Sequence, residues 1–170
     1  MPQKTTPMDI IDFGVEPLTT DPYVLIREKN GNRYMRIYFD PIYCVFIFEE
    51  SEGIKFMPPP IYDLFMNFIE SAGAILGRVV ITDFEANDFN AQIIFKINGN
   101  IISFSATPGD AVVLALKTNT SIEVMNELIE KYQVENKVNT IEYESPDLKK
   151  RGLERIIEKL NPEDIGVHEN

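Results

Sequence analysis

Acidic side chains in several parts of the chain have the types and spacing that could hold a divalent cation. Asp63, Asn67 and Glu70 stand at positions i, i+4 and i+7, which share one face of a helix. Mg²⁺ and Mn²⁺ prefer oxygen ligands, and a cation held by carboxylates can activate water and neutralise a phosphate. The predicted metal ligands are Asp63, Glu70, Asp83 and Asp110. Of these, Asp63 and Asp110 are the predicted catalytic acids.

The acidic positions on the two predicted helices also have a purely structural interpretation. Thr107, Pro108 and Asp110 form the pattern of a capping box with proline at the first helical position, which stabilises a helix start by about 0.5–2 kcal/mol. Asp63 falls in the first turn of its helix, where a negative charge suits the helix dipole. The face that it shares with Glu70 could equally be a solvated surface. The sequence leaves both interpretations open.

Composition excludes several other kinds of site. The 170 residues include one His, one Cys and no Trp. His168 is the third residue from the end, so a Ser-His-Asp triad, a Cys-His pair or a His-rich zinc site is not expected within one chain. One cysteine cannot form an intrachain disulfide or a Cys-based zinc cluster. Cys44 stands among apolar residues and is predicted to be a small buried hydrophobe.

The balance of charge bears on partners and location. With 27 Asp+Glu against 16 Lys+Arg, the formal charge is −11 and the pI is about 4.5, which disfavours nucleic-acid binding because a basic surface is its usual signature. The longest apolar stretches, 42–48 and 111–116, are far short of the roughly 20 residues that a membrane span needs. No signal peptide is recognisable, so we expect a cytoplasmic protein without membrane association.

Two Asn-Gly turns predict the framework that positions these residues. Both central residues of a type I′ turn need positive φ, which asparagine and glycine tolerate. Each Asn-Gly pair is therefore predicted to join two strand-like runs in a hairpin. The predicted hairpin strands are 23–27 with 33–39, and 90–97 with 101–105. Pro41 and Pro108 follow the two hairpins and open short apolar runs. The pattern predicts an α+β fold in which two repeated hairpin-plus-helix units surround one mixed sheet.

The repeat decides one local assignment. Residues 42–48 are rich in β-branched and aromatic side chains and on propensity alone resemble a strand. The matching segment after Pro108 has clear helix-start signals, so we predict a helix over Pro41–Glu50. In the helix between Ile61 and Gly73, a stripe at i, i+3, i+4, i+7 and i+8 is predicted to be buried. The stripe consists of Ile61, Leu64, Phe65, Phe68 and Ile69.

The remaining elements complete the domain plan. Further strands are predicted at Met8–Val15, Arg78–Phe84 and Ser121–Val124, and further helices at Met125–Tyr132 and after Ser145. We divide the chain into a leader and first strand (1–20), a main domain (21–133), and a connector, C-terminal helix and tail (134–170). The last helix concentrates positive charge, which could form a nucleic-acid-binding edge or a solvated surface. Its basic residues are Lys149, Lys150, Arg151, Arg155 and Lys159.

The order of motifs between Asp21 and Tyr132 resembles the bifunctional nuclease domain family. Residues 60–64, Pro-Ile-Tyr-Asp-Leu, are similar to that family's Pro-Leu-Thr-His-Asp-Leu-Leu helix start. Residues 107–117, Thr-Pro-Gly-Asp-Ala-Val-Val-Leu-Ala-Leu-Lys, resemble its Arg-Pro-Ser-Asp-Ala motif and the small-apolar helix after it. The resemblance implies an α+β fold with internal duplication, a homodimer, and hydrolysis of DNA and RNA.

The chain departs from the family pattern at polar positions. Tyr62 stands where the resemblance places a histidine, and Thr107 where it places an arginine. Gly109 replaces a serine, and Ser105 replaces an acidic residue two positions before the arginine. Apolar residues, glycines and the motif aspartates, Asp63 and Asp110, are retained. These replacements preserve a scaffold but remove a potential base and a phosphate-binding guanidinium.

Two functions from different classes therefore compete. The first is a metal-dependent nuclease in which Asp63 and Asp110 act with Mg²⁺ or Mn²⁺. The second is a non-catalytic dimeric interaction or regulatory module that keeps the fold. A third interpretation, binding of a small anion at the helix start of Gly109 and Asp110, is opposed by the acid at that position.

Overall fold

The structure is a computed structural model and describes residues 4–16, 18–19, 21–52 and 61–135. The predicted C-terminal helix, its basic residues and His168 lie outside these residues. The strands are β1 (Thr5–Val15), β2 (Pro22–Glu28), β3 (Tyr34–Tyr38), β4 (Ala74–Glu85), β5 (Asp88–Ile97), β6 (Asn100–Ala106), β7 (Ile122–Met125) and β8 (Gln133–Val134). The helices are α1 (Tyr43–Glu52), α2 (Ile61–Ser71), α3 (Pro108–Thr118) and α4 (Asn126–Tyr132).

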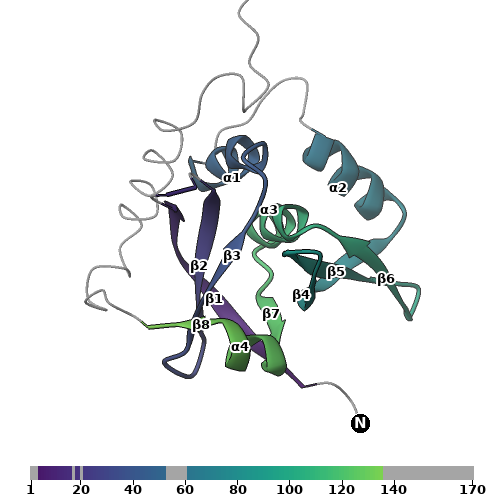
Figure 1. Ribbon diagram of the computed structural model, residues 1–170. Helices are drawn as coiled ribbons and strands as arrows, with labels where there is room; N and C mark the ends of the chain where they lie inside the picture. Colours follow the sequence, from purple (N-terminus) through teal and green to yellow (C-terminus); the bar gives the residue numbers. More distant parts are fainter. Residues whose placement is uncertain (1–3, 17, 20, 53–60, 136–170) are drawn as a thin grey trace, which may run out of the picture.

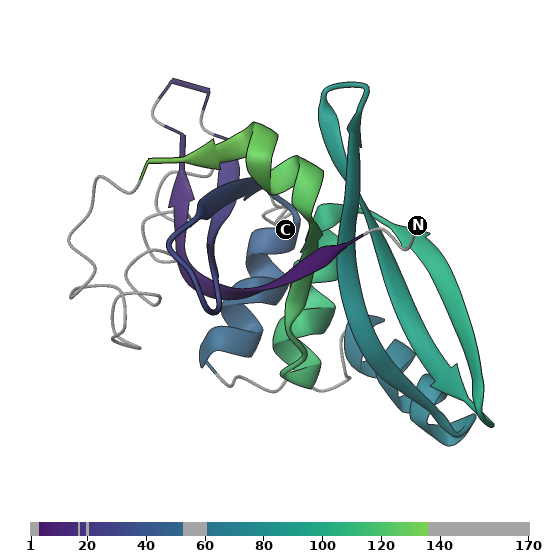
Figure 2. The same ribbon diagram turned by 90° about the horizontal axis from the view of Figure 1, so that it is seen from below.

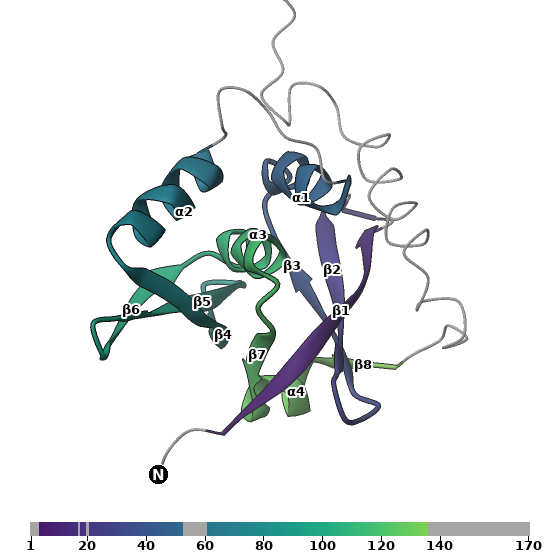
Figure 3. The ribbon, with the colours of Figure 1, turned by 180° about the vertical axis from the view of Figure 1, so that it is seen from behind.

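The strands form one mixed sheet in the order β6-β5-β4-β7-β1-β2-β3-β8. All neighbours pair antiparallel except β4 and β7, which pair parallel. The sheet is curled, so that the β1–β2–β3 arm and the β4–β5–β6 arm stand apart with α3 between them (Figures 1 and 2). Helices α1 and α2 lie on either side of α3, as the view from behind also shows (Figure 3). The predicted α+β class and mixed sheet are confirmed.

Both predicted hairpins are present, but the type I′ turn predicted for the first is wrong, because neither Asn30 nor Gly31 has a positive φ. In the second, Ile97 pairs with Asn100, and the two residues between them, Asn98 and Gly99, have φ of 48° and 80°. Positive φ at both central positions is the requirement of a type I′ turn. A helix follows each hairpin, α1 after β2–β3 and α3 after β5–β6. The predicted helix at Pro41–Glu50 is therefore confirmed, with bounds shifted to Tyr43–Glu52.

Helix α3 forms the centre of the hydrophobic core. Its residues Ala111–Ala115 are all buried, which is the pattern of a helix enclosed by protein on every side. Cys44 on α1 is fully buried within the same core. Burial raises the pKa of its thiol to about 12, so Cys44 is a packing residue, as predicted.

The predicted burial of the α2 stripe is wrong for four of its five residues. Ile61, Leu64 and Phe68 are 63%, 58% and 69% exposed and Phe65 is 37% exposed, whereas Ile69 is partly buried against the core. Met66, outside the stripe, is the one buried residue of this helix. Helix α2 meets the rest of the chain through a neighbouring face, which turns the stripe outward. Periodicity identifies side chains that share a face, but it does not show that the face meets another part of the same chain.

None of the helices in the described ranges has the length and apolar character needed to cross a membrane.

Candidate functional site

Polar side chains from α1, α2 and α3 meet along α3 and join the three helices. We call this cluster the helix seam. It contains the two segments that carry the predicted catalytic acids, the start of α2 and the start of α3. Its members are Tyr43, Glu50, Tyr62, Asp63, Thr107, Asp110 and Lys117.

The first part of the seam is the capping box at the start of α3. The Asp110 backbone N–H donates to Thr107 Oγ1 at 3.1 Å, and the Thr107 backbone N–H donates to Asp110 Oδ2 at 3.2 Å. The Thr107 hydroxyl also donates to Oδ2 at 2.7 Å. These bonds satisfy backbone donors that the first helical turn leaves open. The structural interpretation of Thr107, Pro108 and Asp110 is confirmed in full.

Two tyrosines complete the bonding of this helix start. Tyr62 on α2 donates to Asp110 Oδ1 at 2.6 Å. Tyr43 on α1 lies 2.9 Å from Thr107 Oγ1 and acts as the donor, because the Thr107 proton is used on Asp110. Burial, followed by the bond to Asp110, raises the pKa of Tyr62 well above 10, so Tyr62 stays a phenol and is unsuited to act as a base.

The second part of the seam is a pair of salt bridges made by Lys117, which lies about two helical turns after Asp110 on α3. The Lys117 ammonium bonds to Glu50 of α1 and to Asp63 Oδ1 of α2, the latter at 2.5 Å. Burial alone would lower the pKa of Lys117, but the bonds to Asp63 and Glu50 outweigh burial and raise it. Lys117 therefore stays charged and joins all three helices.

A close packing contact lies beneath these polar bonds. A Cβ atom added to Gly109 would stand 2.2–2.5 Å from the ring atoms of Tyr43. No real Cβ contact is that short, so Tyr43 can occupy its place only because residue 109 has no side chain. The ring of Phe46 packs edge-on against Tyr62 with centroids 5.0 Å apart. We call the closely packed rings of Tyr43, Phe46 and Tyr62 the aromatic layer of the seam.

The structure brings some of the predicted metal ligands near one another and separates others. Asp63 and Asp110 both belong to the seam but bond to different partners, Lys117 and the Tyr62/Thr107 pair. Glu70 is exposed on α2, and Asp83 is exposed on β4, where it accepts from the Asn90 amide at 2.7 Å. In the described ranges, no three His, Cys, Asp or Glu side chains come together as a ligand set.

These contacts also describe how a divalent cation would fit the seam. Mg²⁺ needs only one or two protein carboxylates if water completes its shell. Here the Lys117 ammonium bonded to Asp63 would repel a cation at that carboxylate, and both oxygens of Asp110 already accept bonds from Tyr62 and Thr107. The seam residues as arranged do not fit a metal, and we derive no reaction step through one.

The charge of the seam is a further property. Glu50, Asp63 and Asp110 contribute three carboxylates, whereas Lys117, which bonds to Glu50 and Asp63, contributes the one ammonium. A net negative cluster repels a phosphodiester unless a cation intervenes. Lys117, Glu50 and Tyr43 were not recognised as site residues from the sequence. For Lys117 a signal existed, because it stands seven residues after Asp110 and so on the same face of α3.

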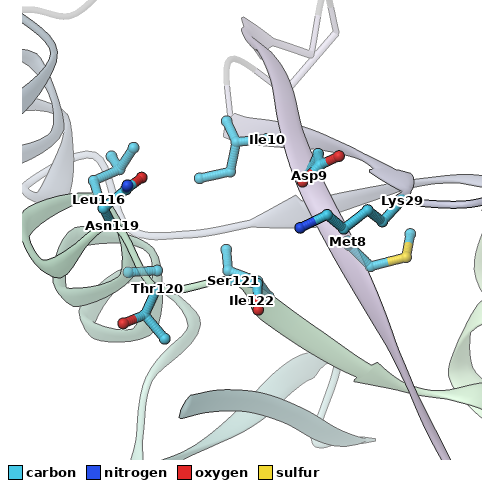
Figure 4. A pocket seen from close by; sticks show the side chains of 10 residues that line it. Met8, Asp9, Ile10, Lys29, Leu116, Asn119, Thr120, Ser121 and Ile122 are labelled. Atoms are coloured by element: carbon cyan, nitrogen blue, oxygen red, sulfur yellow. The ribbon is translucent and has the colours of Figure 1, made fainter. Parts of the chain in front are cut away.

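A separate groove of about 410 Å³ lies between β1, the β2–β3 turn and the end of α3. Lys29 extends into it from one side, and Asn119 and Thr120 lie on the other (Figure 4). Asp9 and Ile10 contribute to its lining, which mixes charges of both signs with apolar side chains. The groove contains none of the seam residues, so it is not part of the candidate site.

Comparison with known proteins decides the family. The model of the bifunctional nuclease domain matches residues 24–137. The chain belongs to the bifunctional nuclease domain family. Two proteins from two strains of Mycobacterium tuberculosis, both named as uncharacterized, are each 33% identical to it over 115 residues, which is 68% of this chain and 68% of the relative. The match covers both sides of the seam.

Membership in the bifunctional nuclease domain family gives the seam its context. The two helix starts that resemble the family motifs are in direct contact here through the Tyr62–Asp110 bond. The structure therefore places the two motifs side by side in the fold. At that place, a phenol donor and a capping threonine occupy the positions where the resemblance puts a histidine and an arginine.

Proposed function

We propose that this member of the bifunctional nuclease domain family acts as a non-catalytic, homodimeric interaction or regulatory module. The observation that carries the proposal is the bonding of the seam. The polar groups of both motif segments bond to one another and hold three helices together. A catalytic site would need some of these groups to face a substrate.

The chemistry of the seam supports the same proposal. Its tyrosines stay protonated, its ammonium is paired with two carboxylates, and its net charge is negative. Phosphodiester hydrolysis needs an activated water and positive charge at the phosphate. Supply of either would require rearrangement of bonds that now stabilise the fold.

The dimeric part of the proposal is supported by apolar side chains on the surface beside the seam. Large apolar residues of α2 and β6 are exposed, and exposed apolar patches of this kind mark interaction sites. The cytoplasmic location and the internal duplication of two hairpin-plus-helix units remain parts of the proposal. So does the division of the chain at residues 20 and 133.

A second candidate is the family's nuclease activity with Mg²⁺ or Mn²⁺. One specific observation favours it: Tyr62 and Asp110, from the two segments that resemble the family motifs, lie 2.6 Å apart. In this candidate Asp63 and Asp110 act as the catalytic acids and metal ligands, supported by Glu70 and Asp83. Nucleic acid would then be a partner despite the acidic surface.

A cleavage assay distinguishes the two candidates. Single- and double-stranded DNA and RNA are incubated with the full chain and Mg²⁺ or Mn²⁺, with and without EDTA. Asp63→Asn and Asp110→Asn are compared with Glu127→Gln, an exposed acid on α4, as the matched control. We expect the same trace of cleavage, or none, in every sample. Metal-dependent cleavage that both aspartate variants lose and Glu127→Gln retains would overturn the non-catalytic proposal.

A further inference from the structure

We infer that the homodimer forms by antiparallel pairing of β6 with β6 of a second copy, centred on Ser103. This inference depends on the dimeric part of the proposed function and adds the surface that makes the dimer. Three observations support it: the edge position of β6, its sequence, and the apolar side chains around it.

Strand β6 offers an open edge. In the part of the chain that the structure describes, β6 pairs only with β5 and ends the sheet. Residues 100–105 are all exposed. Sheet edges that remain free usually carry proline, lysine or another charged residue that blocks pairing with a second strand. Strand β6 reads Asn-Ile-Ile-Ser-Phe-Ser-Ala and has neither proline nor a charge.

The geometry of the hairpin determines which backbone groups face that edge. Ile97 and Asn100 close the two-residue turn, so this pair is hydrogen-bonded and the alternation of the ladder follows from it. The N–H and C=O groups of Ile101, Ser103 and Ser105 therefore point away from β5. A second strand could bond to all of them.

The sequence of β6 is complementary to itself. Antiparallel pairing about Ser103 places Ser103 opposite the partner's Ser103 and Ile102 opposite the partner's Phe104. It also places Ile101 opposite the partner's Ser105. Each outward-facing backbone group then meets an outward-facing group of the other copy, as a two-fold symmetric interface requires. No like charges face one another in this register.

Apolar side chains gather on one face of this edge. Ile102 lies opposite Phe95 in the ladder, and the Phe95 ring contacts both Phe104 and Phe65 of α2, at 6.1 Å in each case. Ile102 and Phe104 therefore share the face of the sheet on which α2 lies, and Figure 2 shows α2 beside β6 at this end of the arm. In the dimer, two copies of Ile102 and Phe104 would pack together there.

The exposed apolar area is sufficient for a dimer. The exposed fractions of the large apolar side chains of α2 and of this face of β6 are Ile61 63%, Leu64 58%, Phe65 37%, Phe68 69%, Ile102 41% and Phe104 55%. With about 200 Å² for each large side chain, these fractions amount to roughly 600 Å². A standard interface buries about 800 Å² per partner, including its polar rim. A second copy would bury this apolar area and, in addition, the backbone of the paired β6 strands, so the two contributions together reach the size of a standard interface.

The test combines cross-linking and sedimentation of the full chain. Ser103→Cys places two thiols opposite each other at a separation that a disulfide can bridge. We expect a covalent species of twice the 19.5 kDa chain mass under mild oxidation. Glu127→Cys on α4 is the matched control and should stay uncross-linked, and the natural Cys44 is buried and does not interfere. A mixture of Ile101→Cys and Ser105→Cys chains should also cross-link, while each alone should not.

A charge substitution provides the second arm. Phe104→Glu should weaken the dimer by roughly 30-fold or more, whereas Leu18→Glu, at a site 93% exposed, should leave it unchanged. The β6 interface would be overturned if the wild-type chain is a dimer, Phe104→Glu does not weaken that dimer, and Ser103→Cys does not cross-link it. The proposal of a dimeric module would then still stand. A 19.5 kDa wild-type species at micromolar concentration would overturn both, including the case in which the chain's own C-terminal segment covers this face.

Discussion

Helix α2 presents two contrasting surfaces, the polar helix seam on one side and the exposed apolar face beside β6 on the other. In the seam, Tyr62 and Asp63 each bond to a residue of α3. On the apolar face, Leu64 and Phe68 are 58% and 69% exposed, with no aromatic ring contact between Phe68 and any other described side chain. The two surfaces lie within one helix of eleven residues.

The comparison shows that the usual placement of residue types is partly reversed on α2. Tyr62 and Asp63 form hydrogen bonds and an ion pair within the chain beside the buried Met66, whereas Ile61, Leu64 and Phe68 face outward. A partly buried polar cluster is stable only when its members are bonded, so the seam should be sensitive to loss of any one partner. An exposed apolar face has no such dependence within the monomer. The following variants test that contrast.

The largest effect is expected from Lys117→Met. Removal of the ammonium leaves Glu50 and Asp63, whose side chains are 22% and 33% exposed, facing each other without a counter-charge. We expect the free energy of unfolding to fall by about 2–3 kcal/mol, less than for a fully buried pair because water reaches both acids. Urea denaturation measures the change. Lys29→Met, at an exposed lysine, is the control and should stay within about 0.5 kcal/mol of wild type.

The aromatic layer beneath the seam should respond next most strongly. Gly109→Ala would ordinarily stabilise a helix by about 1 kcal/mol. Here the new methyl group meets the Tyr43 ring, so we expect a loss of about 1–3 kcal/mol instead. A double-mutant cycle with Tyr43→Ala checks the cause. In that background the same substitution should become neutral or stabilising, and an unchanged loss would show that Tyr43 is not responsible.

The seam should also make the fold sensitive to alkaline pH. The pKa values of Tyr62 and Lys117 are raised in the folded state, so both groups keep their protons after the unfolded chain has released them. The contribution of these two groups to stability is therefore constant below about pH 10 and falls as the pH rises above it, by up to about 1.4 kcal/mol per pH unit for each group. Tyr62→Phe should reduce this slope. An equal slope in wild type and Tyr62→Phe between pH 10 and 11 would contradict the assignment.

Much of the fold could be predicted from local signals. Asn98-Gly99, Thr107-Pro108 and Gly73 act through backbone geometry, which depends on residue type and needs no distant partner. The helix at α1 was predicted despite strand-like propensity, because the segment after Pro108 supplied an analogy. Each of these predictions concerns which local conformation a few residues can adopt.

The candidate site could be predicted only in part, for a physical reason. The resemblance to family motifs singles out the segments of Asp63 and Asp110, but it does not show that they lie together. The partners of those acids do not follow from it either, because Lys117 and Tyr62 reach them across different helices and a carboxylate bonds to any donor nearby. The stripe on α2 was assigned to the core for a similar reason: hydrophobic periodicity is the same whether a face packs within one chain or against another.

The smallest effect on the monomer, and the sharpest contrast within α2, is expected at Phe68. Met66 and Phe68 are two residues apart but 8% and 69% exposed. Met66→Ala should cost about 2 kcal/mol or more, since it leaves a cavity in the core, whereas Phe68→Ala should change monomer stability by less than about 0.5 kcal/mol. Phe68→Ala should instead weaken self-association by roughly tenfold, the equivalent of about 1.4 kcal/mol.

Urea titration at low protein concentration measures monomer stability, and sedimentation at high protein concentration measures self-association. A Phe68→Ala chain that unfolds as easily as Met66→Ala and associates like wild type would show that the apolar face supports the monomer, and the contrast between the two sides of α2 would fail.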